Sequence, residues 1–104
     1  MKADSFCEQF VYDMIYDMNT FDSNYNTSYR NNIFYSYRMP ICQHIKIDNQ
    51  HYFEIVDRDQ SPSTTTTKHI SKITSTIQEI AEKRNDITIV CVQEIVKREL
   101  NNEQ

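Results

Sequence analysis

Residues 41–56 read ICQHIKIDNQHYFEIV, two runs of alternating apolar and polar residues around a short polar stretch. A period of two indicates strands, and the polar stretch between them indicates a β-hairpin. A two-residue turn at Asp48 and Asn49 would mix polar and apolar side chains on both faces. A three-residue loop over 48–50 instead gathers the apolar side chains on one face. We therefore predict the second register, with an apolar face made by Ile41, Ile45, Ile47, Phe53 and Ile55.

The opposite face of this hairpin is then polar. The register sets His44 opposite Glu54 and points His44 and His51 to opposite faces. The three histidines of the chain also lack the spacing of a helical metal pair. The sequence thus predicts a surface His44–Glu54 pair and no metal site.

The chain before residue 41 supplies a further strand and a helix. IFYSYRM (33–39) is aromatic and compatible with a strand, and Pro40 interrupts it, which indicates a bend or an edge position there. Residues 33–56 are therefore predicted as the β-hairpin region. Residues 19–32 are rich in turn formers and lack a helical period, which indicates a loop. Residues 4–18 predict an N-terminal helix, because every fourth position is apolar: Phe6, Phe10, Met14 and Met18.

The chain after the hairpin begins with a helix. Isoleucines at helical spacing predict the main helix over 66–84. The run ITIVCV (87–92) favours a buried strand, so residues 87–100 are predicted to be this strand plus a short helix, with one continuous helix as the alternative. The prediction is one α+β domain over 1–104, a small antiparallel sheet of three to four strands packed against two or three helices.

Composition excludes several classes of function. The chain of 104 residues has no glycine, which excludes the phosphate-binding P-loop, the dinucleotide fingerprint and the nucleophile elbow. Its three cysteines are widely spaced, so a disulfide framework is not expected. We expect reduced thiols in a reducing cytoplasm. The net charge of -4 argues against a general DNA-coating role. We expect neither a membrane span nor a signal peptide, because no apolar run reaches membrane length and the first residues carry charge.

The sequence offers one nucleophile–base pair, Cys42 with His44 two residues later. The two share a face of the predicted strand, but no oxyanion-binding turn accompanies them. We predict a buried thiol at Cys42, no enzymatic activity, no catalytic residues and no cofactor.

The segment SPSTTTTKHISKI (61–73) begins the main helix with two potential cations, at the end where the helix dipole is already positive. One reading is a helix cap supplied by one of the hydroxyls. The other is an anion- or partner-binding site, because amide N–H groups, hydroxyls and cations together favour an anion. The residues of that site are Ser63, Thr66, Thr67, Lys68 and His69.

A second candidate surface is aromatic and basic. The tyrosines at positions 25, 29, 35, 37 and 52, together with Arg30 and Arg38, suit stacking of single-stranded nucleic acid or contact with a protein partner. The plain interpretation is that half of these tyrosines belong to the core. The surface consists of Tyr35, Tyr37, Arg30 and Arg38.

The segments FYSYRMPI (34–41), SPSTTTTKHISKI (61–73) and VQEIVKREL (92–100) resemble a group of short proteins of unknown function encoded by tailed bacteriophages. That group has an aromatic-Ser-Tyr-x-x-Pro strand before a helix start that runs from Ser through paired Thr to Lys-His. Met39 stands where the group usually has Thr, and the group's turn glycines are missing. The matching residues are Ser36, Tyr37, Pro40, Ser63, Thr66, Thr67, Lys68 and His69.

The resemblance implies a phage origin and a small α+β fold. Small non-enzymatic phage proteins commonly bind a host protein or protein–nucleic-acid complex in the host cytoplasm, and some inhibit host defence systems. We therefore expect a phage accessory protein of this kind, acting as a monomer or small homo-oligomer without a membrane. The alternative is a small nucleic-acid-binding module that uses the Tyr/Arg strands and the Thr-Lys-His helix start.

Overall fold

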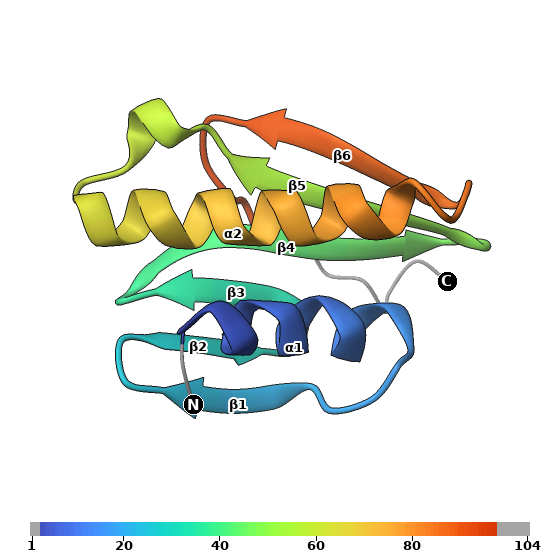
Figure 1. The fold of residues 1–104 in the computed structure, drawn as a ribbon, viewed down its shortest axis with the longest axis horizontal. Helices are drawn as coiled ribbons and strands as arrows, with labels where there is room; N and C mark the ends of the chain where they lie inside the picture. Colours follow the sequence, from blue (N-terminus) through green and yellow to red (C-terminus); the bar gives the residue numbers. More distant parts are fainter. Residues whose placement is uncertain (1–2, 98–104) are drawn as a thin grey trace.

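The computed structural model describes residues 3–97, which form a layer of two helices on one face of a six-stranded sheet (Figure 1). The strands follow one another across the sheet in chain order. Each neighbouring pair is antiparallel except β5 and β6, which are parallel. The elements are α1 (Ala3–Ile15), β1 (Phe21–Asn24), β2 (Thr27–Arg30), β3 (Ile33–Ser36), β4 (Met39–Ile47), β5 (Gln50–Val56), the 3₁₀ helix η1 (Arg58–Gln60), α2 (Thr64–Ala81) and β6 (Ile87–Val92).

The α+β class is confirmed, but the sheet is larger than predicted and is mixed. The segment 19–32, predicted as a loop, contains the antiparallel strands β1 and β2. Its turn formers mark tight turns between four-residue strands. Tyr25 and Asn31 take positive φ values of 54° and 57° there, because the chain has no glycine for those positions. Short strands flanked by turn residues therefore looked like a continuous loop.

The predicted hairpin register is wrong by one residue. Ile47 pairs with Gln50 and His44 with Phe53, so the turn is the two-residue one at Asp48 and Asn49. Asp48 takes the left-handed position, with φ of 57°. The prediction assumed that one face of the hairpin is apolar and the other is exposed to solvent. In the structure, polar residues of this hairpin are buried on both faces.

The helix-side face of the sheet carries the core. Figure 1 shows α1 and α2 side by side over it. Aromatic rings of α1 pack against the sheet, with Phe10 5.2 Å from both Tyr29 and Phe34 between ring centroids. A bulge in β4 leaves Ile41 unpaired between Pro40 and Cys42, and both Ile41 and Cys42 join the core. α2 contributes its buried isoleucines, Ile70, Ile73 and Ile77.

Both helices differ from their predicted bounds. α1 ends at Ile15, and Asp17 has a φ of 56°, so Met18 leaves the apolar stripe and is 62% exposed. α2 begins at Thr64, where Ser63 supplies the cap, and ends at Ala81. Hydrophobic spacing marks the buried face of a helix but not its last turn, which explains both differences.

The face of the sheet away from the helices is covered in part by residues 93–97, which turn back behind it after β6 (Figure 1). There the fully buried Gln43 donates from Nε2 to the Val96 carbonyl at 3.0 Å and to Glu54 Oε1 at 3.0 Å. β6 confirms the strand predicted at 87–92 and excludes one continuous helix, but the predicted burial is wrong, because β6 is an edge strand and none of its residues is buried. The predicted short helix is absent over 93–97, and its remainder lies outside the described residues.

The corrected register brings two histidines together. His44 and His51 lie on the same face, with Nε2 of His44 2.8 Å from Nδ1 of His51, and His44 faces Phe53 instead of Glu54. Burial lowers the pKa of His44 to about 4, helped by the neighbouring His51 and Lys46. Burial also lowers the pKa of His51. The N–H···N bond requires at least one neutral ring, so both effects favour the uncharged pair.

We expect acid to destabilise the fold through this pair. The pKa of His44 is 6.5 when unfolded and about 4 when folded, so the unfolded chain binds more protons between these values. Its contribution to the free energy of unfolding is complete above about pH 6.5 and falls as the pH drops toward 4, by about 2 kcal/mol at pH 4.5. Urea denaturation at pH 7 and 4.5 measures this loss. The loss should shrink by that amount in His44→Gln, and an unchanged loss in the variant would contradict the assignment.

Candidate functional site

The residues of the predicted anion site form a helix cap at the start of α2. Ser63 has an extended conformation and its Oγ accepts from the Thr66 amide at 3.1 Å. The Thr67 hydroxyl donates back to the Ser63 carbonyl at 3.0 Å. These bonds give the hydroxyls of the motif partners inside the protein, and they account for the serine and threonines as capping residues.

A buried hydrogen-bond network joins this helix start to the sheet. Ser36, at the end of β3, has its Oγ 2.9 Å from Thr66 Oγ1 and 2.8 Å from His69 Nδ1. Ser36 and Thr66 are fully buried and His69 is 5% exposed. We call Ser36, Thr66 and His69 the Ser36 network. This role of Ser36 was not predicted from the sequence, although Ser36, Thr66 and His69 all belong to the motifs that resemble the phage proteins.

The five residues of the predicted site therefore separate. Thr66 and His69 point inward to Ser36, while Lys68 is exposed on the first turns of α2. Of the two cations at this helix start, only Lys68 can meet a ligand from solvent. Of the five predicted site residues, the structure thus leaves Lys68 on the surface, while the side chains of the other four form hydrogen bonds inside the protein.

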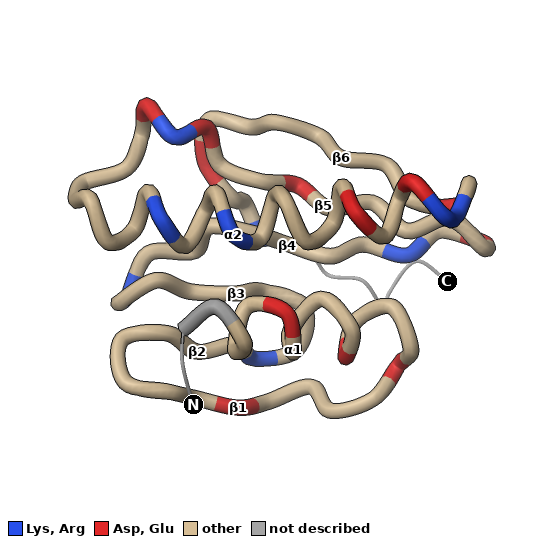
Figure 2. Tube along the Cα trace, in the orientation of Figure 1, with Lys and Arg blue, Asp and Glu red and all other residues tan. Residues whose placement is uncertain are grey.

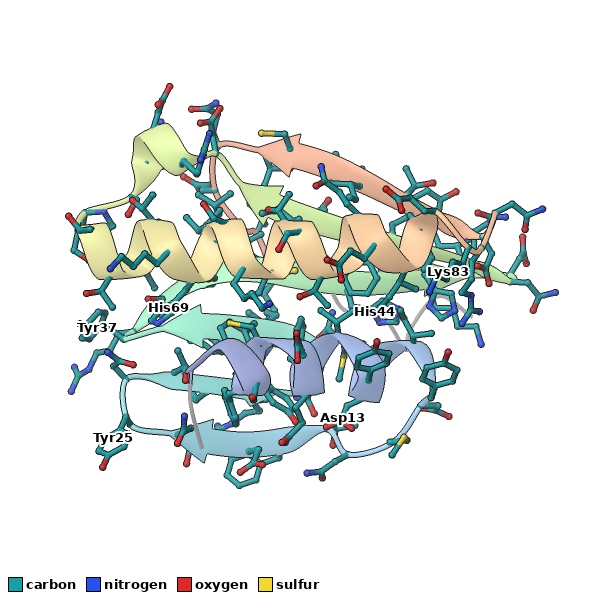
Figure 3. All side chains as sticks on the ribbon, in the orientation of Figure 1. Asp13, Tyr25, Tyr37, His44, His69 and Lys83 are labelled. Carbon is teal, nitrogen blue, oxygen red and sulfur yellow. The ribbon has the colours of Figure 1, made fainter. Side chains whose placement is uncertain are left out.

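A second group of exposed residues lies at the same end of the molecule. The β1–β2 and β3–β4 turns meet there, where the Tyr37 amide donates to the Asn26 carbonyl. These turns form a shallow depression lined by Tyr25, Asn26, Tyr37 and Arg38, which we call the turn surface. Figure 3 shows Tyr25 and Tyr37 at the same end as His69, and Figure 2 shows basic residues on the β3–β4 turn and the first turns of α2.

The two tyrosines of the turn surface are in an unusual state. Tyr25 is fully exposed and Tyr37 is 54% exposed. Both are in the left-handed region, with φ of 54° and 59°, where a residue with a Cβ loses roughly 1–2 kcal/mol. Within residues 3–97, the three other left-handed residues are Asp17, Asn31 and Asp48, of the types that tolerate this conformation. Tyr25 was one of the tyrosines considered for a stacking surface, but the pattern did not distinguish it from the fully buried Tyr29.

The predicted Tyr/Arg surface is only partly assembled. Tyr37 and Arg38 line the turn surface together. Arg30 lies at the far end of β2, where its guanidinium sits over the Phe21 ring, 5.9 Å from the centroid. Tyr35 is half-buried and alternates with Phe34 and Ser36, which face the helices, so it faces the other side of the sheet. A continuous stacking platform of these four residues is not formed.

The Cys42–His44 pair does not have the arrangement of a nucleophile and base. Cys42 is fully buried, and burial raises the pKa of its thiol well above the ordinary range. His44 bonds instead to His51. Among residues 3–97, no three His, Cys, Asp or Glu side chains converge as they would to hold a metal ion. No helix in the same part of the chain is long and apolar enough to cross a membrane.

We expect Ser36→Ala to destabilise the protein by about 1–3 kcal/mol, because it removes two buried hydrogen bonds between β3 and α2. Thermal or urea denaturation measures the loss. The matched control is Ser75→Ala, whose exposed hydroxyl donates only to the Lys72 carbonyl, with an expected effect within about 0.5 kcal/mol. Equal effects of the two substitutions would show that the Ser36 network does not hold the layers together.

Comparison with known proteins gives a family without an assigned activity. A search of curated proteins and a search of solved structures each find no significant match. A family model described as a family of unknown function, DUF8033, matches residues 11–90. That span runs from α1 into β6, so it includes the Ser36 network and the turn surface. The chain belongs to the DUF8033 family.

Proposed function

We propose that this chain is a non-enzymatic phage accessory protein that binds a host protein or a host protein–nucleic-acid complex through the turn surface. Inhibition of a host defence system in the host cytoplasm is the biological role proposed for that binding. The phage origin rests on the motif resemblance. The binding site rests on one observation, the exposed left-handed tyrosines Tyr25 and Tyr37.

Folding alone does not account for these tyrosines. An exposed ring buries little apolar area within the chain, and a left-handed backbone favours glycine over a residue with a Cβ. Tyr25 and Tyr37 thus each lower the stability of the turn that carries them, because the cost of the left-handed backbone is not offset by burial of the exposed ring. A benefit outside the folded chain would offset that loss, and tyrosine is among the residues that contribute most at protein interfaces.

The charges nearby indicate the chemistry of the partner. Arg38 lines the turn surface and Lys68 is exposed at the same end of the molecule. A partner surface with acidic groups around an apolar pocket would take the rings and pair with both cations.

The alternative is a nucleic-acid-binding module that stacks bases on the same tyrosines. Arg38 and Lys68 favour it, since both could contact phosphates. Two observations weigh against it: the net charge is -4, and Arg30 and Tyr35 lie away from the turn surface. We therefore favour a protein surface.

The test replaces both tyrosines by glycine. Tyr25→Gly/Tyr37→Gly should fold with equal or higher stability, by up to about 1 kcal/mol per site, because glycine removes the left-handed penalty. The same variant should lose the host protein that the wild type retains in a pull-down from lysate of the bacterial host. Thermal denaturation and quantitative mass spectrometry of the bound fraction measure the two effects.

The matched control is Asn31→Gly/Asp48→Gly, two left-handed positions outside the turn surface. It should retain the partner, which separates loss of the rings from any effect of glycine. A partner retained by the tyrosine variant would refute the site. Retention that disappears after nuclease treatment, or falls steeply between low and moderate salt, would favour the nucleic-acid alternative.

A further inference from the structure

The two edges of the sheet differ in how they are protected. β1, at one edge, has four residues and includes a charged one, Asp22. β6, at the other edge, has six residues, ITIVCV, and carries no charge or proline (Figure 2). Within residues 3–97 no strand pairs with its outer side. A long, uncharged edge strand is a template for pairing with another strand.

The backbone of β6 shows which groups face outward. The Asp86 carbonyl accepts from the His51 amide and the Val92 carbonyl accepts from the Asp57 amide, so residues at even positions turn toward β5. Successive residues of a strand alternate in the direction of their N–H and C=O groups. The backbone groups of Ile87, Ile89 and Cys91 therefore point away from the sheet.

From this edge we infer that the protein forms a two-fold symmetric dimer in which β6 pairs with β6 of a second copy. Two-fold symmetry makes the two strands antiparallel. Residues whose backbone groups point away from the sheet must then lie opposite one another. In an antiparallel pair, two such residues exchange both of their backbone hydrogen bonds. One register gives hydrogen-bond partners to the backbone groups of all three residues. It sets Ile89 opposite Ile89 of the second copy and Ile87 opposite Cys91 of the second copy.

The side chains of β6 do not oppose this register. The strand carries no charge, so no like charges meet across the two-fold axis, and only apolar residues face one another on the helix side. Two copies of the same edge can therefore serve as the two halves of the interface.

The side chains on the helix side also fit a second copy. A groove of about 390 Å³ runs between α2 and the sheet edge, and its apolar walls are Ile55, Ile70, Ile89 and Cys91. In the dimer the helix layers of both copies lie on the same side, and the two grooves meet over the paired strands. Ile87 and Ile89 of each copy then cover apolar surface at the mouth of the other copy's groove.

Charge variants test the pairing through Thr88 and Val90, which are exposed on the face away from the helices. In the proposed register Thr88 lies opposite Val90 of the second copy. Light scattering coupled to size-exclusion chromatography should show a dimer for the wild type. Thr88→Lys/Val90→Lys should give a monomer, because it sets lysines opposite one another. The matched variant Thr88→Lys/Val90→Glu should remain dimeric, because each lysine then faces a glutamate.

Cross-linking tests the register and does not depend on how well the charge variants fold. In a Cys91→Ser background, Thr88→Cys protein mixed with Val90→Cys protein should form a disulfide-linked dimer on mild oxidation. Either protein alone should cross-link far less, because its own cysteines are diagonal neighbours. A monomeric wild type at all concentrations would overturn the proposal, as would a dimer that survives Thr88→Lys/Val90→Lys. Cross-linking of each single variant as fast as the mixture would overturn the register.

Discussion

A buried serine hydroxyl at the end of β3 links the two layers of this protein. Ser36 bonds to Thr66 and His69 on α2, and the same α2 turn is capped by Ser63. The network fixes where the helix begins relative to the β3–β4 turn. That turn carries Tyr37, so the position of the candidate binding surface depends on hydrogen bonds made in the interior. Apolar packing alone tolerates small shifts of a helix along the sheet. Hydrogen-bonded polar groups that are buried away from water do not, because a shift would break their hydrogen bonds.

The same logic governs the middle of the sheet. Because helices cover one face and residues 93–97 cross part of the other, polar side chains of the central hairpin are taken out of water on both sides. They are paired with one another: His44 with His51, and Gln43 with Glu54. A shift of the register by one residue would separate each pair. Satisfying buried polar groups therefore selects the register as firmly as the isoleucines do.

The sequence was informative where periodicity and burial coincide, as in α2 and in the apolar face of α1. It was misleading where strands are short or buried on both faces. The β1–β2 hairpin was hidden because four-residue strands between turn formers have too few residues to show a period. The His44–His51 pair was hidden because an alternation rule assigns polar residues to solvent. Tyr25 could not be distinguished from the other tyrosines of the possible stacking surface, because its left-handed backbone is visible only in the folded chain.

The parallel pairing of β5 with β6 also has a consequence for how the chain reaches this fold. The strands β1 to β5 can pair as successive hairpins, each closing a short loop soon after its residues are made. β6 must instead wait until all of α2 has been synthesised, because His51 pairs with Ile87 across that helix. Until then β5, with Phe53 and Ile55 on its inner face, is the open edge of a nascent sheet. Protection of β5 from other chains during synthesis is therefore set by the arrival of the last strand, and not by the collapse of the first half of the chain.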